Sequence, residues 1–130
     1  MTLEGRRVLV LGVGVAGRSA AEVTAELGGT AVTVDANGAA DHRDVSEVDL
    51  ASFDVVMASP GFAPHSAAVR ACQEAGLDIW SEMEFAWRVR RPGIPWVLVT
   101  GTNGKTTTTQ MVGAIAAAGG LDVRVCGNMG

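Results

Sequence analysis

A glycine-rich turn between an apolar run and an amphipathic segment constrains the fold of this chain more than any other feature. Residues 12–17 read Gly-Val-Gly-Val-Ala-Gly and directly follow the apolar run from Val8 to Leu11. A short apolar run bounded by charge and by glycine is typical of a strand buried on both faces. Behind the turn, apolar residues recur at helical spacing at positions 16, 20, 23 and 27. The order strand, glycine turn, helix predicts a Rossmann-like α/β fold built on a parallel sheet.

The same GxGxxG pattern predicts a phosphate-binding site. Gly12 would allow the tight turn, Gly14 would let a pyrophosphate approach the backbone, and Gly17 would let the helix pack on the strand. The N-terminus of the helix would supply free N–H groups and partial positive charge. Asp35 ends the next apolar run, 18 residues after Gly17, where a carboxylate accepts hydrogen bonds from a ribose or a base. A tight turn without a ligand, with Asp35 as a loop or capping residue, is the alternative interpretation.

The remaining part of the first 93 residues continues the alternation of strands and helices. The apolar patterns predict strands at 31–34, 55–58 and 79–80, helices at 68–75 and 81–90, and an irregular segment with at most a short element at 36–52. Ser81 and Glu84 have the spacing of a capping box. Ser59, Pro60 and Gly61 follow a predicted strand. They form either an ordinary turn or a further loop of the nucleotide site, because carboxyl ends of parallel strands line the ligand crevice.

A break in the pattern at residues 91–95, Arg-Pro-Gly-Ile-Pro, predicts a linker. After it we expect a strand at 96–100, a helix at 105–118 and a strand at 123–126. The sequence therefore predicts one domain over residues 1–93 and the beginning of a P-loop ATPase α/β domain over residues 94–130. Because the last residues form a glycine-rich loop after a predicted strand, we expect a fragment of a longer protein, with the rest of this domain and a C-terminal domain absent.

The predicted second domain begins with a phosphate-binding loop between its first strand and its helix. The loop consists of Gly101, Thr102, Asn103, Gly104, Lys105, Thr106 and Thr107. Backbone N–H groups of such a loop cradle phosphates, Lys105 would reach the terminal phosphates, and the Thr106 hydroxyl would bind Mg²⁺. The loop departs from GxxxxGK[ST], because Val99 stands at the place of the first glycine. A glycine-rich loop with an exposed lysine is the alternative.

Bulk properties argue against several other classes of protein. The net charge of -4 gives no electrostatic argument for binding nucleic acid or an anionic membrane. No apolar stretch approaches the roughly 20 residues needed to cross a bilayer, and the N-terminus does not resemble a signal peptide. Cys72 and Cys126 form no CxxC motif, and we expect both to be reduced, buried thiols. The composition predicts a soluble cytoplasmic protein.

The loop at residues 101–107 resembles the ATP loop of the Mur ligases, which build the peptide stem of peptidoglycan, and shares its departure from the strict pattern. The resemblance covers the whole chain. Residues 12–19, 59–61, 81–85 and 127–130 resemble most the family member that adds D-glutamate to UDP-N-acetylmuramoyl-L-alanine. The resemblance implies these two substrates, ATP and Mg²⁺ as cofactors, and a cytoplasmic, monomeric enzyme with no nucleic acid or membrane partner.

The resemblance also implies roles for single residues. The first domain would bind the UDP end of the sugar nucleotide rather than NAD, through Gly14, Val15, Ala16, Asp35, Ala36, Ser59, Pro60, Gly61 and Asn128. Asp35 would contact the uracil, and Asn128 would contact the substrate near its diphosphate and sugar. Several relatives carry a hydroxyl side chain beside this aspartate, where the present chain has Ala36. Lys105 would be catalytic, and Thr106 would hold the metal ion.

The implied reaction has two steps. The substrate carboxylate attacks the γ-phosphate of ATP and gives an acyl phosphate and ADP, and the amine of D-glutamate then displaces phosphate. Three alternatives stay open from the residues alone. They are an NAD-dependent oxidoreductase domain, a non-catalytic nucleotide-binding module, and another Mur or folylpolyglutamate-type ligase.

Overall fold

The computed structural model describes residues 2–127, and the chain separates into two compact units, Met1–Pro92 and Gly93–Gly130. The first unit contains four strands, β1 (Arg7–Leu11), β2 (Thr30–Val34), β3 (Val55–Ala58) and β4 (Ile79–Ser81). Its helices are α1 (Val15–Glu26), α2 (Ala67–Glu74) and α3 (Glu82–Val89), with 3₁₀ turns η1 (Val45–Glu47) and η2 (Leu50–Ser52). The described part of the second unit contains the helix α4 (Lys105–Ala118).

The four strands of the first unit form one parallel sheet in the order β2-β1-β3-β4. The chain leaves β1 for β2 on one side and later returns to place β3 on the other side, so the strand order reverses at β1. In open parallel sheets, ligands bind outside the carboxyl ends of the strands at such a reversal. The sheet confirms the predicted Rossmann-like α/β arrangement and directs attention to the loops that follow β1 and β3.

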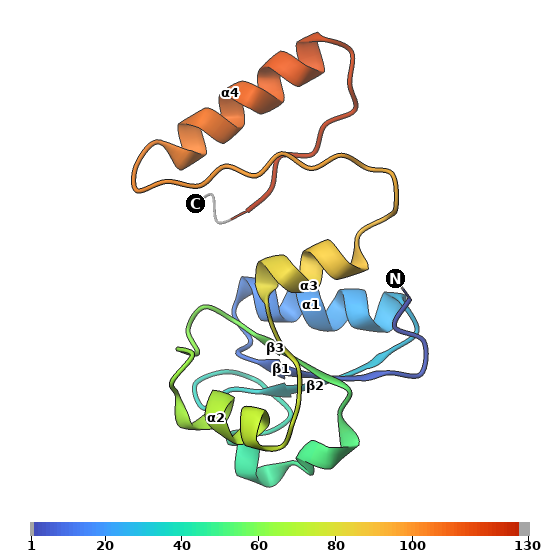
Figure 1. The fold of residues 1–130 in the computed structure, drawn as a ribbon, viewed down its shortest axis with the longest axis vertical. Coiled ribbons are helices and arrows are strands. Elements are labelled where there is room, and N and C mark those ends of the chain that lie inside the picture. Colours follow the sequence, from blue (N-terminus) through green and yellow to red (C-terminus); the bar gives the residue numbers. More distant parts are fainter. Residues whose placement is uncertain (1, 128–130) are drawn as a thin grey trace. The chain divides into compact units, whose positions relative to one another are not determined.

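Both faces of the sheet are covered, as the continuous apolar run of β1 requires. All four residues from Val8 to Leu11 are fully buried. Because side chains alternate along a strand, Val8 and Val10 pack with α1 and α3, whereas Leu9 and Leu11 pack with α2 on the other face (Figure 1). Burying each such side chain stabilises the fold by about 1.5–3 kcal/mol. The central strand is therefore a rigid base for the glycine turn that follows it.

The segment predicted as irregular, residues 36–52, contains the two 3₁₀ turns η1 and η2. Asp44 and Asp49 cap them, each by accepting a hydrogen bond from the backbone N–H two residues further on. Val45 and Phe53 are buried in the cluster on the α2 face of the sheet. The segment thus completes the core on the side of β2 and β1 that α2 leaves open.

The second unit corrects three predictions from the sequence. Within the described residues, neither 96–100 nor 123–126 is a strand, because a strand requires backbone hydrogen bonds to a neighbouring strand and no ladder pairs these segments. Val97 and Leu98 are accordingly exposed at 71% and 65% of their surface. Cys126, expected to be buried, lies in one of these unpaired segments and is exposed, whereas Cys72 is buried in the first unit. The predicted helix is confirmed as α4.

No helix within residues 2–127 is both long enough and apolar enough to cross a bilayer.

Candidate functional site at the carboxyl end of the sheet

The three glycines of the first turn occupy three different environments. Gly12 has a φ of +97°, a conformation that other residues rarely adopt, and its N–H donates to Val34 O at 2.8 Å. A Cβ at Gly17 would lie 1.8 Å from Gly12 O, so only glycine lets α1 approach the turn this closely. A Cβ at Gly14 would meet nothing within 4 Å. The turn is therefore tightly packed on its inner side and open beside Gly14.

Helix α1 begins at this open side. Gly14 is its N-cap, and because glycine has no side chain, the cap residue itself contributes no group to the first-turn N–H donors. The first turn contains no acidic residue, and Val15 is 79% exposed. Exposed N–H groups and the positive end of the helix dipole are suited to an anion such as a diphosphate.

Asp35 connects the glycine turn to the end of β2. Its Oδ2 accepts from Val13 N–H at 2.9 Å, and its Oδ1 accepts from Asn37 N–H at 2.8 Å. These two hydrogen bonds lower the pKa of the Asp35 carboxyl, Val13 contributing most, against a small opposing effect of burial. The side chain is half-buried, and Ala36 beside it is exposed. Each carboxylate oxygen has a second acceptor position, so Asp35 can hold the turn and still receive a hydrogen bond from a ligand.

The loop after β3 closes the same region. Ser59 is buried, and its hydroxyl donates a long hydrogen bond of 3.5 Å to Gly12 O. Ser59 N–H donates to Leu11 O at 2.9 Å, which holds the start of this loop beside the end of β1. Pro60 and Gly61 are exposed, and a Cβ at Gly61 would meet nothing within 4 Å. The structure thus brings together the glycine turn, Asp35 and Ser59, which are far apart in the sequence.

The loop predicted to bind phosphate in the second unit precedes α4. Gly101 and Gly104 have φ values of +156° and +75°, and Gly104 is the N-cap of the helix. The Lys105 ammonium donates to Gly101 O at 2.8 Å and to Thr102 O at 3.4 Å. All seven loop residues, including Asn103, Thr106 and Thr107, are exposed. Two carbonyl groups of the loop therefore hold the Lys105 ammonium over it. A phosphate oxygen could take their place as the acceptor.

One predicted site residue, Asn128, lies outside the described residues. Sequence patterns, in turn, do not indicate Val13, Gly38 or Asp41, which contact or support Asp35 and its loop. Their contributions are a backbone N–H, a missing side chain and a hydrogen bond to a neighbouring strand. Such features belong to no short motif.

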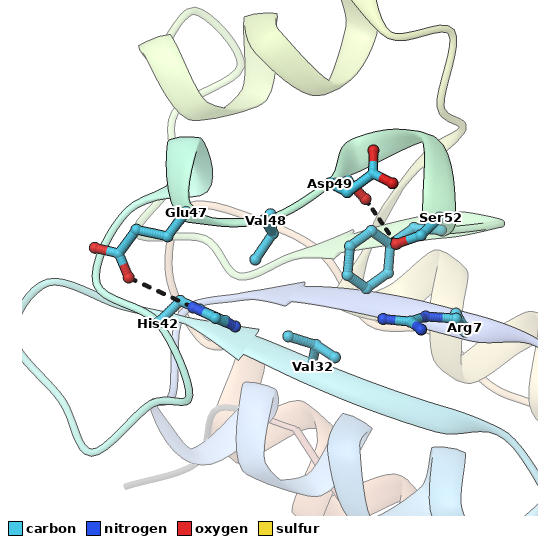
Figure 2. Close-up of a pocket in the computed structure, with 8 residues that line it drawn as sticks. Arg7, Val32, His42, Glu47, Val48, Asp49 and Ser52 are labelled. Carbon is cyan, nitrogen blue, oxygen red and sulfur yellow. Dashed lines mark hydrogen bonds and ion pairs between the residues drawn. The ribbon is translucent and has the colours of Figure 1, made fainter.

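A hollow of about 340 Å³ lies elsewhere in the first unit (Figure 2). It is lined by Arg7, Val32, His42, Glu47, Val48, Asp49, Ser52 and Phe53. None of these was predicted as a site residue, and cationic and anionic side chains are mixed around it, with His42 Nδ1 at 3.5 Å from Glu47 Oε2. Its lining runs from Arg7, at the amino end of β1, to His42, and includes neither the glycine turn nor Asp35 or Ser59. We therefore place the candidate nucleotide site at the glycine turn.

Comparison with known proteins gives relatives along the whole chain. It is 38% identical over 98% of its length to the UDP-N-acetylmuramoylalanine–D-glutamate ligase of Nocardia farcinica. It is 41% identical over 99% of its length to the ligase of the same name from Bifidobacterium longum subsp. infantis, and 40% identical over 98% to that of Rhodococcus jostii. No family model matches the chain. The chain spans about three tenths of the length of these relatives.

Proposed function

We propose that this chain is the N-terminal part of a cytoplasmic, ATP-dependent ligase that joins D-glutamate to UDP-N-acetylmuramoyl-L-alanine. The resemblance to this ligase family is confirmed by relatives named UDP-N-acetylmuramoylalanine–D-glutamate ligase, which match 98–99% of the chain. The observation that supports the proposal most directly is this match together with two glycine-rich loops, each at the N-terminus of a helix, in two separate units.

The first unit would bind the UDP end of the substrate. The diphosphate would approach Gly14, Val15 and Ala16, where the turn is open and no side chain caps the first-turn N–H groups. The Asp35 carboxylate would accept a hydrogen bond from the uracil, with Ala36 offering only a methyl group beside it. Ser59, Pro60 and Gly61 would close the site from the side of β3, and Asn128 would contact the substrate near its diphosphate and sugar.

The second unit would bind ATP and Mg²⁺. Three features of the loop fit a phosphate. Gly101 and Gly104 have positive φ values, the N-cap has no side chain to occupy the first N–H groups of α4, and the Lys105 ammonium is a cationic donor. The backbone N–H groups of Thr102 and Asn103 would contribute to the same cradle, and Thr106 and Thr107 lie in the first turn of α4, which follows it. Bound Mg²⁺ would neutralise charge on the phosphates, with Thr106 as its ligand from this chain.

The proposed reaction forms an acyl phosphate and ADP, and phosphate then leaves as the D-glutamate amine attacks the acyl carbon. Phosphoryl transfer requires positioning and charge neutralisation more than covalent help from the protein. The contribution of this chain is therefore to hold the two nucleotides and to place Lys105 against the transferring group. We expect these 130 residues to have no ligase activity by themselves, because the relatives are more than three times as long.

Isothermal titration of the chain with UDP-N-acetylmuramoyl-L-alanine, UDP and NADH tests the assignment of the first unit. We expect both UDP ligands to bind, NADH not to bind, and Asp35→Ala to weaken UDP binding. Binding of NADH without binding of UDP would instead favour an oxidoreductase domain. Titration with ATP and Mg²⁺ is the corresponding test of the second unit, with Lys105→Met expected to abolish binding.

A further inference from the structure

The loop that follows β2 leaves the sheet at Asp35 and returns at His42. Two backbone hydrogen bonds close it, from His42 N–H to Thr33 O and from Asp35 N–H to His42 O, both at 3.1 Å. His42 also forms an isolated parallel bridge with Val34. The two ends of the loop are therefore held together, and the position of Asp35 depends on how the returning end is fixed.

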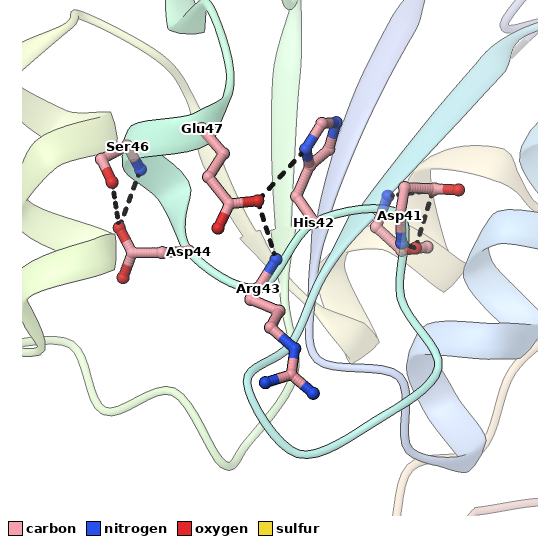
Figure 3. A network of polar contacts seen from close by, with 7 residues as sticks. Asp41, His42, Arg43, Asp44, Ser46 and Glu47 are labelled. Carbon is pink, nitrogen blue, oxygen red and sulfur yellow. Dashed lines mark hydrogen bonds and ion pairs between the residues drawn. The ribbon is translucent and has the colours of Figure 1, made fainter.

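Asp41 fixes that returning end. Its Oδ2 accepts from both the N–H and the hydroxyl of Thr33 at 2.8 Å, and its own N–H donates to Thr33 Oγ1 at 2.9 Å (Figure 3). The two bonds from Thr33 lower the pKa of the Asp41 carboxyl, the backbone bond contributing most. Asp41 is itself exposed at the loop surface, so its contacts are directed inward, to the strand that carries Asp35.

The other side of the loop touches the glycine turn. Asp35 accepts from Val13 N–H at 2.9 Å, and a Cβ at Gly38 would lie only 2.2 Å from Val13 Cγ2. The loop therefore packs closely against the turn, with no room for a side chain at Gly38. A shift of the returning end would change the position of Asp35 relative to the Val13 N–H.

We propose that Asp41 is a positioning residue of the nucleotide site, which holds the loop of residues 35–42 closed so that Asp35 keeps its hydrogen bond to the glycine turn. Asp41 contacts no ligand in this arrangement and acts through Thr33 and Asp35. The consequence for UDP binding rests on the proposed function, whereas the consequence for the turn does not.

Amide hydrogen exchange followed by NMR tests the effect on the turn without any ligand. We expect the Val13 amide to exchange about tenfold faster in Asp41→Ala and in Asp35→Ala, as for the loss of a charge-assisted hydrogen bond. The matched control is Asp44→Ala, which removes an aspartate that accepts from Ser46 N–H and from the Ser46 hydroxyl but is not joined to β2. An unchanged Val13 amide in Asp41→Ala would overturn the proposal.

The Leu9 amide in the central strand reports whether the fold survives each substitution. Where Asp41→Ala raises exchange of Leu9 as well, Thr33→Val serves instead, because it removes only the two bonds made through the hydroxyl. We expect Thr33→Val to speed exchange at Val13 and not at Leu9. Equal protection of Val13 in Thr33→Val and in the wild type would contradict the proposal.

Titration with UDP then tests the effect on the site. We expect Asp41→Ala to weaken UDP binding, and to add nothing when Asp35 is already alanine, since residues that act through one another are not additive. Additive losses would refute the route through Asp35. If UDP fails to bind the wild type, the proposed function of the first unit fails, while the exchange of Val13 still decides whether Asp41 positions the turn.

Discussion

Replacing Gly17 with alanine would place a methyl carbon 1.8 Å from the carbonyl oxygen of Gly12. Real Cβ atoms essentially never approach another atom within 3.0 Å, so the helix and the turn must separate by more than an ångström. That movement is opposed on both sides. Gly12 is joined to Val34 by a 2.8 Å hydrogen bond, and α1 is packed against the sheet through Ala20.

The expected cost is that of overpacking a well-packed region, about 1–3 kcal/mol. For a unit of this size, each kcal/mol lowers the melting temperature by about 4–8 °C. Thermal unfolding followed by circular dichroism should therefore show a fall of the midpoint of about 10 °C in Gly17→Ala. UDP binding should fall as well, because the displaced helix no longer presents its first-turn N–H groups to the diphosphate.

Gly14→Ala is the matched control, because its methyl group would meet nothing within 4 Å and the φ of -63° suits alanine. Its cost in stability should not exceed that of alanine at an N-cap, about 0.5–1 kcal/mol, so its unfolding midpoint should fall less than that of Gly17→Ala. Its methyl group should still obstruct an approaching diphosphate and weaken UDP binding. Equal midpoints for Gly17→Ala and Gly14→Ala would refute the reasoning from the Gly12 contact.

Three further predictions concern single side chains of the described chain. The Val13 and Asn37 N–H groups lower the pKa of Asp35 in the folded state. The free energy of unfolding therefore gains from the Asp35 carboxylate above the unfolded pKa of about 4, and this gain is lost as pH falls through the lower folded pKa. In Asp35→Asn, the free energy of unfolding measured in urea should fall less steeply with pH in this acid range. Trp80 is buried, and among residues 2–127 its Nε1 has no hydrogen-bond partner, so Trp80→Phe should cost less than about 1 kcal/mol in urea unfolding, against about 3–5 kcal/mol for Trp80→Ala. Burial raises the pKa of the Cys72 thiol, whereas Cys126 is exposed. A thiol reagent should therefore react rapidly with Cys126 alone in the native chain, and Cys126→Ser should show no rapidly reacting thiol.

Local signals were sufficient to predict the first unit because its contacts follow sequence periodicity. The run from Val8 to Leu11 is apolar at every position, and the structure buries it on both faces. The capping bond predicted at Ser81 is present, with Ser81 Oγ accepting from Glu84 N–H at 3.2 Å. The glycine turn was recognisable from the spacing of its three glycines, two of which have a steric reason to be glycine. The domain boundary, the site residues and their ligands stay predictions.

Other features depend on contacts that a one-dimensional pattern does not contain. Val97 and Leu98 have the composition of a strand, but a strand exists only with a partner, and none pairs with them among residues 2–127. Asp41 looked like an ordinary polar residue of an irregular segment. Its importance comes from Thr33, eight positions earlier on the edge strand, and no residue spacing indicates that pairing.

The sheet of the first unit is complete at Ser81, and its last helix ends at Val89, before the linker begins. Among residues 2–127, every strand pairing therefore lies in a segment that leaves the ribosome before the linker. Chains are synthesised at about 5–20 residues per second, whereas mixed α/β domains fold in about milliseconds. We expect the first unit to fold during translation. The exposed apolar residues of the second unit, such as Ile115, are the part that chaperones would have to protect from aggregation.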